Sequence, residues 1–145
     1  MHRRRNVLVI LLGVAGLFAI TLIGSNLDSI LPQHPTAANQ TVQVGPYQIT
    51  LLVSPNPPNT TDLANLTIQI VKPATEQLVT NATVLLDNSM ETMDMGTGHA
   101  QAKLQNNGTY LAQLPFTMSG PWQVSVLITV PGSQTLTAHF DVMAQ

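Results

Sequence analysis

The sequence predicts an all-β sandwich of about seven strands, preceded by one N-terminal transmembrane helix. Two observations carry this prediction. An unbroken apolar run follows a cluster of arginines at the start of the chain. Further on, apolar residues recur at every second position, between turn residues spaced by about eight to twelve positions. No stretch outside the apolar run has helical periodicity. The 145 residues therefore hold one domain of ordinary size and an N-terminal appendage.

The appendage is expected to hold the protein in a membrane. Residues 1–6 are a cytoplasmic basic segment, because three arginines before an apolar run keep the N-terminus inside. Residues 7–24 are a transmembrane anchor or an uncleaved signal. As a helix, the run of seventeen residues from Val7 to Ile23, interrupted only by two glycines and a threonine, would be about 26 Å long, slightly short of a hydrocarbon core of about 30 Å. No small-residue cleavage site follows closely, so a retained anchor is preferred to a cleaved signal peptide.

A flexible linker is expected at residues 25–40, which lose periodicity and include Pro32 and Pro35. The chain has no cysteine, which excludes disulfides, thiolate metal sites and lipid attachment at cysteine. Beyond the arginines, two lysines oppose seven carboxylates, a net charge of −5. Nucleic acid and anionic lipid are poor partners for such a domain, and cations are better ones.

Residues 41–145 are the predicted sandwich domain. Pro55, Pro57 and Pro58 cannot donate to a strand ladder and mark a loop. Asn107-Gly108 favours a tight hairpin, since both residues tolerate positive φ. Seven strands of this length fit an immunoglobulin-like sandwich. The strands are expected at residues 47–53, 65–71, 83–86, 100–104, 110–116, 122–130 and 136–142.

Within these strands, alternation assigns the inward side chains. Ala100, Ala102 and Leu104 alternate with polar residues and are expected to face the core. Trp122 leads the inward alternation of its strand and is expected to be a core aromatic residue.

Soft and polar side chains gather in two segments, residues 89–99 and 116–122. Thioether sulfur binds Cu(I) well and hard ions weakly, so methionines clustered with a histidine predict a copper site. Outside the cytoplasm, methionine keeps this affinity without the oxidation to which thiolates are prone. The candidate metal ligands are Met90, Met93, Met95, His99 and Met118.

Packing is the competing interpretation of the same methionines. Met118 is in phase with the inward residues of the strand before it, and methionine often fills gaps in cores. If residues 90–95 formed a strand, Met93 and Met95 would share a face and Met90 would not. The three side chains therefore converge only across a turn, which the glycines that follow permit but do not require.

The two segments also resemble a known family. Met93-Asp94-Met95-Gly96, Asn107-Gly108-Thr109-Tyr110 and the stretch from Phe116 to Val124 are similar to the YtkA-like domain family. The resemblance covers roughly residues 45 to 143. It implies a small immunoglobulin-like sandwich on the outer side of a bacterial membrane, often behind a single anchor or fused to copper-resistance membrane proteins.

Carried over by position, the resemblance implies that four residues belong to the feature shared by the family. Pro121 stands where the family often has a basic residue, and His99 has no fixed counterpart. The four shared residues are Met93, Met95, Met118 and Trp122.

The expected function is therefore non-catalytic. A nucleophile paired with a base and a glycine-rich phosphate loop are both missing from the sequence, so an enzyme is not expected. We expect a membrane-anchored extracytoplasmic domain that binds or delivers Cu(I) or another heavy metal, with a membrane copper-handling or transport protein as partner. The alternative is a structural or interaction module of a membrane transport or oxidase assembly system, without a metal.

Overall fold

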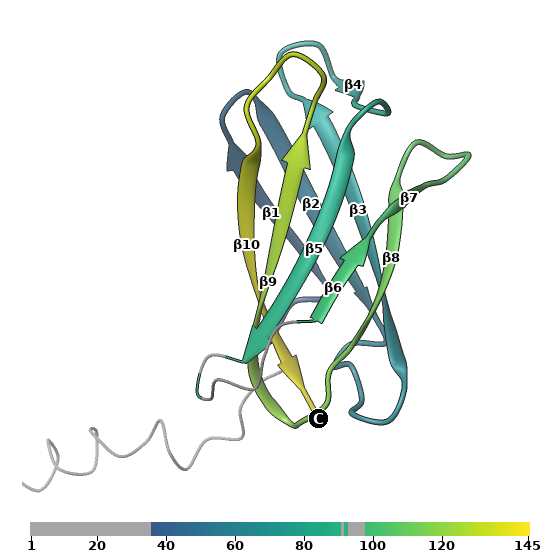
Figure 1. Ribbon diagram of the computed structural model, residues 1–145, viewed down its shortest axis with the longest axis vertical. Helices are drawn as coiled ribbons and strands as arrows, with labels where there is room; N and C mark the ends of the chain where they lie inside the picture. Colours follow the sequence, from purple (N-terminus) through teal and green to yellow (C-terminus); the bar gives the residue numbers. More distant parts are fainter. Residues whose placement is uncertain (1–35, 91, 93–97) are drawn as a thin grey trace, which may run out of the picture. The chain divides into compact units, whose positions relative to one another are not determined.

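A computed structural model describes residues 36–90, 92 and 98–145, and in these ranges the protein is a two-layer β-sandwich (Figure 1). Ten strands and no helix are found among the described residues. The predicted all-β sandwich is thereby confirmed. Within the described ranges there is accordingly no helix long and apolar enough to cross a membrane. The predicted segments 1–6 and 7–24, and most of the linker at 25–40, lie outside these ranges.

Both sheets are antiparallel throughout. The larger sheet has the order β1-β2-β3-β8-β7, and β4 pairs with the end of β3. The smaller sheet has the order β10-β9-β5-β6. The larger sheet consists of β1 (Asn39–Val44), β2 (Tyr47–Ser54), β3 (Leu63–Lys72), β4 (Gln77–Leu78), β7 (Lys103–Leu104) and β8 (Tyr110–Pro115). The smaller sheet consists of β5 (Thr83–Met90), β6 (Gly98–Gln101), β9 (Gly120–Thr129) and β10 (Leu136–Ala144).

The core lies between the sheets and is built from the inward side of the period-two alternation. In β2, every second side chain is at most 5% exposed, and β9 follows the same pattern from Trp122 to Ile128. Burial of these apolar side chains stabilises the fold, which has no disulfide to assist it.

All seven predicted strands are present, and the structure adds β1 and β4. The third predicted strand is longer than expected, because β5 continues past residue 86 to Met90. The alternation of apolar residues does not show this continuation, because the inward position after Leu86 is occupied by the polar residue Asn88. Its polar side chain points inward, 1% exposed, and its Nδ2 donates a hydrogen bond of 2.7 Å to the Pro115 carbonyl oxygen of the opposite sheet.

The strand predicted at 100–104 is divided between the two sheets. β6 pairs with β5, whereas β7 pairs with β8 in the other sheet. Ala102 lies at the crossing, 8% exposed, with its N–H bonded to the Val84 carbonyl oxygen at 2.9 Å. The inward assignment of Leu104 is wrong, since this side chain is 49% exposed. After Ala102 the chain belongs to the larger sheet, so the alternation followed from Ala100 no longer tells which side chains face the core.

Residues 36–40 are bound to both sheets. Toward the larger sheet, Val53 N–H donates to Ala38 O at 2.9 Å, and Asn56 Nδ2 donates to Thr36 O at 2.7 Å. Toward the smaller sheet, Gln40 Nε2 donates to Asp141 O at 2.6 Å. The chain therefore joins the domain as an ordered segment before β1 begins.

Candidate methionine and histidine site at one end of the sandwich

Several strand ends meet at one end of the sandwich, called here the methionine end. β5 ends and β9 begins there, with Met90 opposite Trp122 in the register. β8 ends there too, since Pro115 O accepts the hydrogen bond from Asn88. The described parts of the segments 89–99 and 116–122 are thus neighbours in space.

Met90 packs inside this end of the core. Its side chain is 8% exposed. A Cβ built on Gly120 would lie 2.7 Å from the Met90 methyl carbon, and Gly120 has a φ of +132°. The backbone conformation therefore favours glycine at this position, and a larger residue would also have to displace the end of the Met90 side chain. This burial agrees with the packing interpretation for Met90.

Met118 lies between β8 and β9, half-buried against the core. Its carbonyl oxygen accepts a hydrogen bond of 2.9 Å from Trp122 Nε1. The indole ring meets the Phe116 ring edge to face, with centroids 5.5 Å apart and an interplanar angle of 83°. Trp122 is 3% exposed, which confirms it as a core aromatic residue. The hydrogen bond from Trp122, whose ring packs against Phe116, therefore fixes the position of the Met118 backbone.

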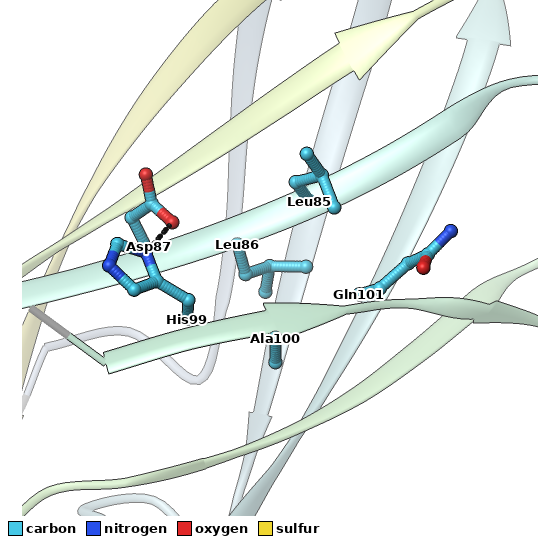
Figure 2. A pocket seen from close by; sticks show the side chains of 6 residues that line it. All are labelled: Leu85, Leu86, Asp87, His99, Ala100 and Gln101. Carbon is cyan, nitrogen blue, oxygen red and sulfur yellow. Dashed lines mark hydrogen bonds and ion pairs between the residues drawn. The ribbon is translucent and has the colours of Figure 1, made fainter.

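His99 lies on the outer face of the smaller sheet, opposite Asp87 in the register (Figure 2). Its Nδ1 is 2.5 Å from Asp87 Oδ1, and the side chains are 66% and 35% exposed. A carboxylate next to Nδ1 favours the tautomer that carries the proton there, which leaves Nε2 with the lone pair. Carboxylates orient metal-binding imidazoles in this way. The pair borders a shallow groove of about 400 Å³ that continues to Gln101.

Asn88 fixes the start of β6 as well as the contact between the sheets. Its partner in the register is Gly98. A Cβ on Gly98 would lie 2.3 Å from Asn88 Oδ1, so the two strands approach each other closely at this point. Asn88 Oδ1 is buried without a hydrogen-bond partner in the described part of the chain. The space between Gly98 and the inward side chain of Asn88 is therefore too small for a side chain at position 98.

Of the candidate ligands, Met90, His99 and Met118 lie in the described ranges, and Met93 and Met95 lie outside them. Across residues 36–90, 92 and 98–145, no three His, Asp or Glu side chains are grouped closely enough to hold a metal ion. Met90 is buried in the core, whereas His99 lies on the outer face of the smaller sheet, so the structure does not bring these two candidate ligands together.

Sequence reasoning did not identify Asp87 as the partner of His99. The register contains the missing signal, because β5 and β6 form a hairpin in which residue 86 is opposite 100 and residue 87 is opposite 99. A third strand extended to Met90 would have placed the carboxylate opposite the imidazole.

Comparisons with known proteins give the family of this fold. The model of the YtkA-like family matches residues 41–127, more than half of the chain, and the protein belongs to this family. No curated protein matches the sequence. Among solved structures, the chain is similar to FetP of uropathogenic E. coli, which was expressed recombinantly in the periplasm of E. coli. The TM-score is 0.56 at 11% identity, over 77% of this chain and 97% of FetP, a likeness of fold.

Proposed function

We propose that this protein is a membrane-anchored, extracytoplasmic YtkA-like domain that binds Cu(I) at its methionine end and passes it to a membrane copper-handling protein. Membership of the YtkA-like family supports the placement outside the cytoplasm. FetP, a similar fold produced in the periplasm, supports it too.

One observation carries the copper proposal. The connection between β5 and β6, which contains Met93 and Met95, starts and ends at strands that lie at the methionine end. Met118 is joined to the same end through its hydrogen bond from Trp122. The proposal therefore takes its soft ligands from two segments that are distant in sequence and whose described flanking strands lie at one end of the domain.

The ligand chemistry suits Cu(I) more than harder ions. Thioethers prefer Cu(I), and an imidazole adds a nitrogen ligand of intermediate softness. Asp87 contacts the His99 ring at Nδ1, and in this proposal Nε2 is the nitrogen that binds the metal. In this proposal the ligands are His99, Met93, Met95 and Met118, and Met90 supports them by packing.

A Cu(I) titration of the full chain tests the proposal, under reducing conditions and with a chromophoric competitor. We expect one ion per chain, and loss of binding in the variant Met93→Leu, Met95→Leu, Met118→Leu. These substitutions nearly conserve volume, so the fold is retained. Met143→Leu is the matched control, because Met143 is half-buried in β10 and outside the proposed ligand set. Failure of the parent chain to bind Cu(I) would overturn the proposal.

Met90→Leu is measured separately. Because the side chain is 8% exposed and fills the space above Gly120, we expect copper affinity to be unchanged. Loss of binding in this variant alone would add Met90 to the ligands.

A metal-free interaction module is the second candidate function. The methionine end also presents Leu63, 53% exposed and opposite Pro115 in the register. An exposed leucine at the same end of the domain as half-buried Met118 is the observation that favours docking of a protein partner. A chain that binds no Cu(I) would make this the leading function. In both proposals the protein has no catalytic activity.

A further inference from the structure

The end of the sandwich opposite the methionine end holds a pocket of about 310 Å³. It lies where β3 and β9 end, between β4 and the turn that joins β9 to β10, at the top of Figure 1. Its polar lining comes from three strands of the larger sheet and from two connections, the one before β5 and the one between β9 and β10. These polar residues are Tyr47, Lys72, Gln77, Asn81 and Ser133.

The charge of this lining is one-sided. Lys72 supplies an ammonium group, and none of the described residues that line the pocket has a carboxylate. Lys72 Nζ lies over the Tyr47 ring, 5.9 Å from its centroid, so a cation–π contact holds the amine beside the pocket. Tyr47 itself is 5% exposed and gives this contact a fixed base. In a domain with an excess of acids, such a cationic pocket favours an anion.

One wall of the pocket is rigid because β4 and the residues after it are bonded on two sides. β4 pairs with the end of β3, and Val79 N–H donates to Ile70 O at 2.9 Å. The Tyr110 hydroxyl donates to Val79 O and accepts from Ala82 N–H, both at 3.0 Å. These bonds tie residues 77–82 to both neighbouring strands.

The opposite wall is a closed turn. Ser133 N–H donates to Val130 O at 3.0 Å, and Gly132 has a φ of +80°. A type II turn requires positive φ at its third position, here Gly132, and often has proline at its second, here Pro131. Both walls are therefore formed before a ligand arrives, which lowers the entropic cost of binding.

We propose that this pocket binds the anionic oxygen group, carboxylate or phosphate, of a small polar solute. The Lys72 ammonium is the charged donor. The amides of Gln77 and Asn81 and the Ser133 hydroxyl both donate and accept, which suits the hydroxyl or amide groups of such a solute. A volume of about 310 Å³ is at the lower limit of ligand pockets, so the solute is small. The proposal is independent of copper binding.

The two lysines of the chain provide the test. Lys72 and Lys103 are its only lysines, so the full chain with ¹³C-labelled lysine gives one side-chain NMR signal for each. The probes are inorganic phosphate and, separately, succinate at equal ionic strength. We expect the Lys72 signal to shift and saturate while the Lys103 signal moves little. The probe that saturates at the lower concentration distinguishes a phosphate from a carboxylate ligand.

Lys72→Gln and Lys103→Gln are the matched variants. Both residues are exposed, so the fold should tolerate either change. We expect Lys72→Gln to weaken binding by about tenfold or more, the loss expected for a charge-assisted hydrogen bond, as read from backbone amide shifts at residues 77–81. Lys103→Gln should leave affinity unchanged. Equal, non-saturating shifts of both lysines, or no shift with either probe, would overturn the proposal.

Discussion

At the scale of single residues, the contact between Asn88 and Gly98 is the tightest constraint beside the candidate site. We expect Gly98→Ala to destabilise the domain by about 1–3 kcal/mol, because its methyl would meet Asn88 Oδ1 at 2.3 Å inside a packed layer. Urea unfolding measures this loss. Trp122, the only tryptophan of the chain, provides the fluorescence signal.

Asn88→Ala provides the control for this prediction. That change removes the oxygen that the new methyl would meet, so Gly98→Ala should cost less in the Asn88→Ala background. Asn88→Ala has a cost of its own, since the Pro115 carbonyl oxygen loses its donor. An equal cost of Gly98→Ala in both backgrounds would show that the close approach is not the cause.

At the scale of elements, Tyr110 of β8 holds the segment between β4 and β5. We expect Tyr110→Phe to destabilise the domain by about 1–3 kcal/mol, because Val79 O and Ala82 N–H lose their common partner. Tyr47→Phe is the matched control. Across the described ranges, the Tyr47 hydroxyl has no hydrogen bond, so its removal should change stability by less than about 0.5 kcal/mol. Similar losses in urea unfolding for both variants would contradict the bracing role of Tyr110.

Strand prediction succeeds where one face of a strand is fully buried. Along β2, β3 and β9, alternation and burial coincide, and the predicted strands match. β1 was not predicted, because its inward Val42 and Val44 are only half-buried at the sheet edge. β4 has two exposed residues and no alternation to detect. The crossing at Ala102 also leaves no signal, since alternation does not say which sheet a strand joins.

Prediction of the site has the same limit. Composition alone singles out the methionines and His99. The partner Asp87 depends on the register of β5 against β6, and the contact between Asn88 and Pro115 depends on how the two sheets face each other. Both are tertiary relations, so they became visible only with the fold. The pocket at Lys72 is of the same kind, because its walls come from β4 and from the turn after β9.

At the scale of the whole molecule, the anchor predicted at residues 7–24 leads to a prediction about membrane association. We expect the full chain to float with lipid vesicles and to resist carbonate extraction, while a chain of residues 36–145 stays in the soluble fraction. The double substitution Val14→Arg, Leu17→Arg places two charges in the middle of the apolar run. It should release the full chain from the vesicles, since a charge at the bilayer centre costs about 3 kcal/mol or more. Equal partitioning of all three chains would contradict the anchor.

A chain that begins at Thr36 lacks the predicted anchor and keeps the folded domain. The contacts of residues 36–40 show why the truncation should begin there. Thr36 accepts from Asn56 through its carbonyl oxygen, and its Oγ1 accepts from Met143 N–H at 3.2 Å, so it contacts the loop after β2 and strand β10. Gln40 adds the bond to Asp141 O. A chain that begins at Thr36 keeps these bonds, whereas one that begins at Thr41 loses them and leaves part of the β10 edge unpaired. We therefore expect the first to unfold at the same urea concentration as the full chain and the second to unfold at a lower one. A loss of stability already in the first chain would show that the domain also depends on residues before Thr36.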